Sequence, residues 1–164
     1  MTLIVETGSI VPNANSYVTD AEYVAYAAAR GKTIGATAAA REIELTKAVD
    51  YLEYYRDEYK GLKVTRDQPL QWPRYSVWVD SFQLNSNEIP KELKKSQMEA
   101  AILEAGGVSL APSGTIENVQ SQSLGSLSIS YFSGGTWKTV QHKSLDQFLE
   151  ILLINQGDLR SHRV

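Results

Sequence analysis

The sequence predicts a mainly α-helical protein with a minor β component (mainly α, α+β minor). We expect about four helices and one small β-strand or hairpin element. Three stretches repeat apolar residues at helical spacing, a fourth has the start and stop signals of a helix, and residues 123–135 alternate polar and apolar side chains. A chain of 164 residues can bury a core as one domain. We expect that domain to span residues 1–157, followed by a tail at 158–164.

The first 18 residues are rich in turn formers and are expected to be extended and turn-like. The first helix then begins at a capping box, in which Thr19 and Glu22 each bond the backbone N–H of the other. Gly31 is a plausible stop. The apolar stripe of this helix consists of Ala21, Val24, Ala25 and Ala28.

The second helix is the strongest helical pattern, and we expect it to run from a cap at Thr37 to Gly61. One charged residue, Arg56, falls on its apolar stripe, and Lys60 near its end suits the helix dipole. The stripe consists of Leu45, Ala48, Val49, Leu52, Arg56 and Tyr59.

An irregular segment is expected over residues 62–89, and a loop of this length in a compact domain usually has a function. Pro90 suits the first turn of a third helix, which Gly106 and Gly107 end. Small side chains on this helix leave room for close approach of another helix. They are Ser96, Ala100 and Ala101.

The C-terminal third begins with a predicted linker at residues 108–118. The alternation over residues 123–135 indicates a half-buried strand, with residues 133–140 as a returning partner. The last helix is expected to start at a capping box of Ser144 and Gln147 and to end at Gly157. Its apolar stripe consists of Leu145, Phe148, Leu149 and Leu152.

The residue patterns that carry catalysis are missing from the sequence. There is no cysteine, and His142 and His162 have no further histidine beside them, whereas a zinc site needs clustered ligands. Neither a Gly-x-Ser-x-Gly elbow nor a phosphate-binding glycine loop is present. We therefore expect a protein that is not an enzyme and that uses no metal and no cofactor.

Charge and hydropathy restrict the location and the partners. The net charge of −3 and the pI of about 5.4 argue against a dedicated nucleic-acid binder, because cationic side chains supply most of that affinity. The N-terminus lacks the basic region of a signal peptide, and no apolar run approaches the roughly 20 residues of a membrane span. We expect a soluble protein that acts or is assembled inside a cell.

Tyrosines crowd the second predicted helix, at positions 51, 54, 55 and 59. Bases can stack on aromatic rings, but acidic residues are interleaved with these tyrosines. Packing or a subunit interface is therefore favoured over base stacking, with Tyr51 and Tyr55 as the interface candidates.

The stretch "QWPR" within the irregular segment has two interpretations. One is an exposed Trp/Arg interaction site, and the other is a structural pin. The pin is favoured because a long loop needs an anchor. Trp72 would then be buried between the second and third helices, Pro73 would set the turn, and Arg74 would bond a backbone carbonyl or a carboxylate. Trp78, further along, is the best candidate for contact with a neighbouring subunit.

Five motifs, in this order and spacing, resemble one protein family over nearly the whole chain: "LIVETGSIVPNANSYVTDAEYVAYAAARG", "LTKAVDYLE", "GLKVTRDQPLQWPR", "IPKELKKSQMEAA" and "SLGSLSISYFSGG". The family is that of tailed-phage head–tail connector (adaptor) proteins, which are also described as DnaT-like single-stranded DNA-binding proteins. The chain departs from the family in "ETG", where an acidic residue followed by glycine is usual, and in a short segment between Arg30 and Thr37.

The connector resemblance implies an adaptor-like helical protomer in a homo-oligomeric ring of about twelve copies. The ring would lie in the virion neck, the head–tail junction, after assembly in the host cytoplasm. Its partners would be the portal protein and a stopper, tail-terminator or tail-tube protein. Double-stranded DNA would pass through the channel without sequence-specific binding. The C-terminal arm is a common portal contact in such adaptors, which here implies Leu159, Arg160, His162 and Arg163.

The second description implies a different class of protein, a single-stranded DNA-binding module of replication. The acidic net charge favours the connector over this alternative, because a channel that passes DNA must avoid gripping it. The connector is therefore the function expected from the sequence.

Overall fold

Four α-helices are the main regular elements in the part of the chain that the computed structural model describes, residues 2–110 and 143–154. They are α1 (Asp20–Ala28), α2 (Ala38–Glu53), α3 (Lys91–Ala105) and α4 (Lys143–Leu149), and the 3-10 turn η1 (Glu150–Leu152) continues α4. Two antiparallel pairs of short strands join β1 (Leu62–Lys63) to β2 (Arg74–Tyr75) and β3 (Trp78–Val79) to β4 (Phe82–Gln83). The predicted class, mainly helical with minor β structure, is confirmed. The predicted domain boundary at residue 157 stays a prediction.

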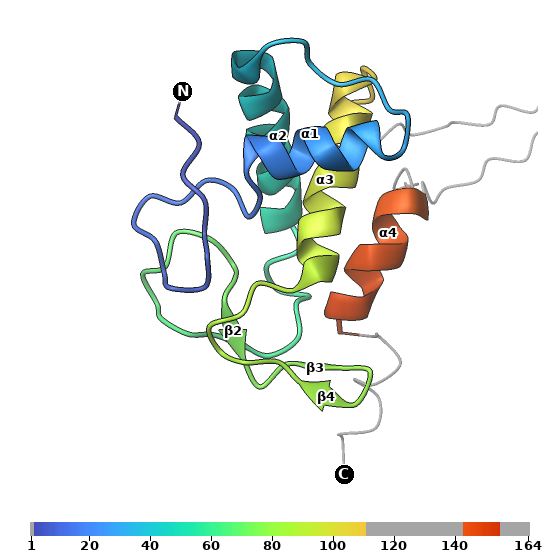
Figure 1. The fold of residues 1–164 in the computed structure, drawn as a ribbon. Coiled ribbons are helices and arrows are strands. Elements are labelled where there is room, and N and C mark those ends of the chain that lie inside the picture. Colours follow the sequence, from blue (N-terminus) through green and yellow to red (C-terminus); the bar gives the residue numbers. More distant parts are fainter. Residues whose placement is uncertain (1, 111–142, 155–164) are drawn as a thin grey trace, which may run out of the picture. The chain divides into compact units, whose positions relative to one another are not determined.

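The helices pack around α3, which lies between α2 and α4 while α1 crosses over α2 and α3 (Figure 1). The small side chains predicted to allow close helix approach are fully buried on α3: Ser96, Ala100 and Ala101. No helix among the described residues is long and apolar enough to cross a membrane.

The start of α1 is confirmed, but its predicted apolar stripe is wrong. Thr19 caps the helix and forms the expected capping box with Glu22. The buried side chains are Tyr23 and Ala27, whereas the predicted stripe of alanines and Val24 faces solvent. A tyrosine buries far more apolar surface than an alanine, and the hydroxyl of Tyr23 donates a hydrogen bond of 3.0 Å to Glu44 at the edge of the core.

The C-terminal end of α2 is eight residues earlier than predicted, at Glu53 instead of Gly61. Beyond the helix, the backbone of residues 58–60 pairs with the end of the described chain. Lys60 N–H donates to Leu152 O at 2.9 Å, and Ile154 N–H donates to Glu58 O at 2.7 Å. These long-range bonds take the place of further helical bonds. Arg56, predicted on the apolar stripe, is exposed instead, and the Lys60 ammonium donates a hydrogen bond to Ile151 O.

The last helix also differs at both ends from its prediction. It begins at Lys143, so Ser144 lies inside the first turn and is not the cap, and it ends in η1 because Leu153 bridges to Tyr59. The predicted end, Gly157, lies outside the described residues. Three members of the predicted stripe are buried and Phe148 is half-buried. The buried three are Leu145, Leu149 and Leu152.

The observed strands lie within residues 62–89, which were expected to be irregular. The expectation holds for the rest of the segment and is wrong for these two short strand pairs. Strands of two residues are too short to show a period of two in the sequence. The strand predicted at residues 123–135, its partner at 133–140 and nearly all of the linker predicted at 108–118 lie outside the described residues.

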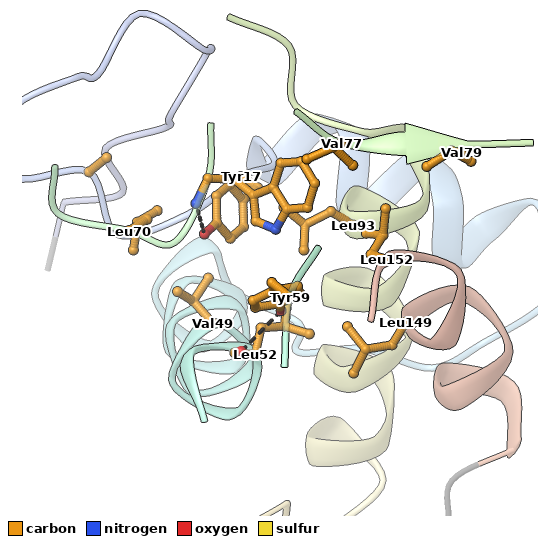
Figure 2. Close-up of a cluster of buried hydrophobic side chains, with 12 residues drawn as sticks. Tyr17, Val49, Leu52, Tyr59, Leu70, Val77, Val79, Leu93, Leu149 and Leu152 are labelled. Carbon is orange, nitrogen blue, oxygen red and sulfur yellow. Dashed lines mark hydrogen bonds between the residues drawn. The ribbon is translucent and has the colours of Figure 1, made fainter. Parts of the chain in front are cut away.

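The core consists of two clusters of buried side chains, and Tyr51 packs against both. The first, here called the Trp72 cluster, contains Ala14, Tyr17, Val49, Leu52, Tyr59, Leu70, Trp72, Val77, Val79, Leu93, Leu149 and Leu152 (Figure 2). The second, here called the Leu45 cluster, contains Val18, Tyr23, Leu45, Ala48, Met98, Ala100, Ala101, Leu110 and Leu145.

Candidate functional site

The "QWPR" stretch is an anchor in the core and not an exposed site. Trp72 has no exposed surface and lies in one cluster with residues of α2 and α3, so its predicted burial is confirmed. Its indole ring meets Tyr59 edge to face, with the ring centroids 5.9 Å apart. Its backbone N–H donates to the Tyr17 hydroxyl at 3.3 Å. Pro73, joined to Trp72 by a cis peptide bond, is buried as well.

Arg74 bonds backbone carbonyls, which were one of the two kinds of partner predicted for it. Its guanidinium donates to Lys60 O at 2.8 Å and to Gly61 O at 2.7 Å. Burial lowers the pKa of Arg74 from its ordinary value, because the charged form is disfavoured away from water. The buried guanidinium is nevertheless hydrogen-bonded to these two carbonyls. Gly61 is required here, because its φ is +68° and a Cβ would lie 2.3 Å from Tyr75 O. The Arg74 side chain thereby fixes β2 to the segment that follows α2.

A carboxylate that the sequence analysis missed completes this anchor. Glu53, the last residue of α2, accepts hydrogen bonds from the Tyr17 hydroxyl at 3.1 Å and from both the backbone and the side chain of Gln71. Burial, together with the charge of Glu53, raises the pKa of Tyr17 well above its ordinary value, so the hydroxyl stays protonated and donates. The network ties the N-terminal segment, α2 and the "QWPR" stretch together.

Aromatic side chains gather in solvent just after this anchor, in residues 74–83, here called the aromatic segment. Tyr75 is 42% exposed, Trp78 is 55% exposed and Phe82 is 75% exposed. Trp78 and Phe82 belong to the β3–β4 hairpin, whose connecting residues Asp80 and Ser81 have φ values of 50° and 68°. Positive φ at both positions is typical of a type I′ turn, which suits the twist of a two-stranded hairpin. Large apolar side chains left exposed in this way often mark an interaction site.

Few cations are free to accompany these rings. Lys63 ends β1, Arg66 lies between β1 and β2, and Asp67 follows Arg66. Lys63 donates to Gln68 O at 3.2 Å, whereas the side chain of Arg66 has no ion pair or hydrogen bond with the described residues. Most other described cations are bonded to carboxylates. These ion pairs are Arg30–Glu99, Arg41–Asp20, Lys47–Glu104, Arg56–Asp57, Lys91–Glu92 and Lys94–Glu22.

The two tyrosines predicted at a subunit interface pack within the chain. Tyr51 and Tyr55 are half-buried against the core, their hydroxyls lie 2.7 Å apart, and their rings meet edge to face. This contact does not test an interface. The residues predicted to contact a portal, Leu159, Arg160, His162 and Arg163, lie outside the described residues, as does His142.

An open groove of about 520 Å³ lies beside the start of α1, but its acidic groups already have partners. Its lining includes Glu6, Glu22, Asn85, Asn87, Glu88 and Lys94. The Glu6 carboxylate accepts the backbone N–H groups of Gly8, Ile10 and Val11, and Glu22 bonds Lys94. No group of three or more potential metal-binding side chains occurs among the residues that the structure describes.

The fold and the exposed segment define a mainly helical domain that presents aromatic side chains to solvent. Residues 1–164 match the family described as "Putative DnaT-like ssDNA binding protein", and the chain belongs to this family. Neither the curated proteins nor the solved structures gave a match. The family description supports the single-stranded DNA alternative better than the connector expected from the sequence.

Proposed function

We propose that the protein binds single-stranded DNA. The observation that carries the proposal is the match of all 164 residues to a family described by that activity. The exposed rings of the aromatic segment support it, because unpaired bases stack on aromatic side chains whatever their sequence. The net charge of −3 does not oppose local binding, but it means that any attraction for phosphates is confined to a small part of the surface.

The proposed activity is binding alone, with no catalytic step and no requirement for a metal or cofactor. A duplex hides its bases in the stack, whereas a single strand can offer their faces to an exposed ring such as that of Trp78. The protein should therefore prefer single strands over duplexes of equal length.

The test is fluorescence anisotropy of a labelled oligo-dT of about 20 nucleotides, long enough to cover the usual binding-site sizes. The titration is carried out at low salt, where electrostatic contributions are strongest. We expect saturable binding at micromolar protein and weaker binding of the matching duplex. Failure of the full-length protein to bind at about 100 μM would remove the proposal, because even sequence-independent DNA binding has dissociation constants of about 1 to 100 μM.

A second candidate function is the head–tail connector ring of about twelve copies, located in the virion neck. Two observations favour it. Six of the described cations are engaged in ion pairs within the chain, and Trp78 is the kind of exposed residue that dominates protein interfaces. In this function Trp78, Tyr51 and Tyr55 would contact a neighbouring copy. Leu159, Arg160, His162 and Arg163 would contact the portal.

The connector is tested by native mass spectrometry and negative-stain microscopy, with and without the portal protein of the same phage. Rings in either sample would support it. A chain that stays monomeric with portal, and that is missing from purified virions, would exclude it.

A further inference from the structure

We infer that single-stranded DNA binds along the aromatic segment by base stacking, with Trp78 as the main platform, and that this binding depends only weakly on salt. The inference rests on the proposed function and adds to it the site and the mode of binding. It requires that the rings be dispensable for the fold, held in place, and accompanied by few cations.

Trp78 is dispensable for the core because its neighbours on both sides supply the contacts. Val77 and Val79 are buried in the Trp72 cluster, where Figure 2 shows both side chains. Alternation along an extended strand then directs Trp78 to the opposite side, where more than half of its surface is exposed. Exposing a large aromatic side chain forgoes burial that would stabilise the fold, so its presence here fits a binding role.

The rings are also held on an ordered backbone. Trp78 pairs with Gln83 and Val79 pairs with Phe82, and Leu84 N–H donates to Val77 O at 2.9 Å, which extends the pairing. On the other side of Tyr75, the side chain of the buried Arg74 donates hydrogen bonds to Lys60 O and Gly61 O, two carbonyls that follow α2. A platform held in place loses little conformational entropy when a base stacks on it.

The charges near the rings favour a polyanion only weakly. Residues 62–83 carry three cations, Lys63, Arg66 and Arg74, and two acids, Asp67 and Asp80. Arg74 is buried and bonded to carbonyls, so within residues 62–83 only Lys63 and Arg66 are placed to reach phosphates. For single strands the slope of log K against log salt is about −0.7 per neutralised phosphate, which gives a slope of about −0.7 to −1.4 here.

Tyr54 offers a matched comparison. It is the other exposed aromatic residue among the described residues, at 70% exposure, but it follows Glu53 and precedes Asp57 and Glu58. If exposure of a ring were enough for binding, Tyr54 would serve as well as Trp78. Its acidic neighbours should instead repel the phosphates of a strand.

The test measures oligo-dT affinity of full-length variants whose thermal melts match the wild type. Trp78→Ala should weaken binding about 5- to 150-fold, the range expected for loss of one stacked base. Phe82→Ala should weaken it less, because Phe82 pairs with Val79 and therefore lies on the opposite face of the hairpin from Trp78. Trp78→Phe should retain most of the affinity, and Tyr54→Ala should leave it unchanged. Between about 50 and 500 mM salt, the slope for the wild type should lie near −1, and Arg66→Gln should make it shallower by about 0.7.

The outcomes separate the inference from the proposed function. Wild-type protein that does not bind oligo-dT removes both. Wild-type protein that binds, with Trp78→Ala binding equally well or with a slope steeper than about −3, overturns the inference and leaves the proposed function in place. If Trp78→Ala and Phe82→Ala change the oligomeric state in native mass spectrometry but not the affinity, the segment is a subunit interface, and the inference is overturned.

Discussion

Trp72 illustrates how single residues fasten a connecting segment to the core. Its ring packs edge to face on Tyr59, its backbone N–H donates to the Tyr17 hydroxyl, and its indole Nε1 has no hydrogen-bond partner among the residues that the structure describes. An unpaired indole N–H costs some stability, so the stabilising effect of this residue must come from packing in the Trp72 cluster. That packing holds the start of the aromatic segment against α2 and α3.

Trp72→Ala should lower the free energy of unfolding by about 3–5 kcal/mol, because truncating a fully buried Trp removes apolar contacts and leaves a cavity. Urea denaturation followed by circular dichroism measures this change. Trp78→Ala is the matched control and should change stability by no more than about 0.5 kcal/mol, since that ring is mostly in solvent. A midpoint for Trp72→Ala close to that of the wild type would contradict the anchor.

Residue-level predictions succeeded where the sequence supplied a local reason. Trp72 next to proline in a long connection predicted an anchor, and Arg74 was expected to bond a carbonyl or a carboxylate. The partners of that anchor could not be predicted, because Glu53 and Tyr17 lie 18 and 55 residues away from the groups that they bond. Gln97, which bonds Tyr17 N–H and Leu45 O inside the core, was missed for the same reason.

At the scale of elements, helix starts were predicted better than helix ends. The caps of α1 and α2 are local, since Thr19 and Thr37 each accept an N–H three residues ahead. The end of α2 depends on pairing with residues 152–154, and no pattern within the helix reveals it. The strand pairs were missed because register and turn conformation replace periodicity when a strand has two residues.

One ion pair joins the first turns of α1 and α2 and should make that junction sensitive to acid. Arg41 bonds both oxygens of Asp20, at 2.6 and 2.8 Å, and holds the pKa of Asp20 below its ordinary value of 3.8. The unfolded chain therefore binds a proton at a pH where the folded chain does not. The stabilisation is complete above about pH 5 and is lost as the pH falls through the lowered pKa.

Asp20→Asn tests this junction by urea denaturation at a series of pH values from about 7 to about 2.5. The wild type should be more stable than the variant at neutral pH, and the difference should shrink in acid. Asp57→Asn is the control, because the Asp57 side chain is 92% exposed and its pair with Arg56 is long, at 3.6 Å. A difference between wild type and Asp20→Asn that stays constant down to the lowest pH would exclude the mechanism.

The turn between β3 and β4 holds backbone strain that glycine would relieve. Ser81 has a φ of 68°, which costs a non-glycine residue about 1–2 kcal/mol, while glycine loses about 0.5–1 kcal/mol through the entropy of the unfolded chain. Ser81→Gly should therefore stabilise the protein by about 0.5–1 kcal/mol, measured as a raised urea midpoint. Ser86→Gly, at an exposed turn position without positive φ, should not stabilise it. Equal effects of the two changes would contradict the assigned turn.

At the scale of the whole molecule, residue periodicity predicted the class of fold, but nothing in the sequence pattern predicted the exposed aromatic segment as a whole. Helical spacing indicated a mainly helical protein, and the structure agrees. Net charge pointed away from nucleic acid, yet a net charge sums groups that the fold pairs off, such as Arg41 with Asp20. The exposed aromatic segment is a local feature that a net charge does not describe, and Trp78 was predicted only as a contact with a neighbouring subunit.

The two core clusters should unfold as one unit, because α4 contributes to both and Tyr51 packs against both. Leu145 belongs to the Leu45 cluster and has no exposed surface, whereas Trp72 reports on the other cluster. Trp78 and Trp137 are first replaced by Phe, so that Trp72 is the only tryptophan left to report by fluorescence. In this background, Leu145→Ala should lower the free energy of unfolding by about 2–5 kcal/mol. Trp72 fluorescence and far-UV circular dichroism should shift together to one lower urea midpoint, as a two-state transition requires. Phe82→Ala, which truncates a ring in solvent, should leave both signals near their original midpoint. A Trp72 transition unmoved by Leu145→Ala would mean that the clusters are independent, and that the anchor of the aromatic segment is stable without the rest of the core.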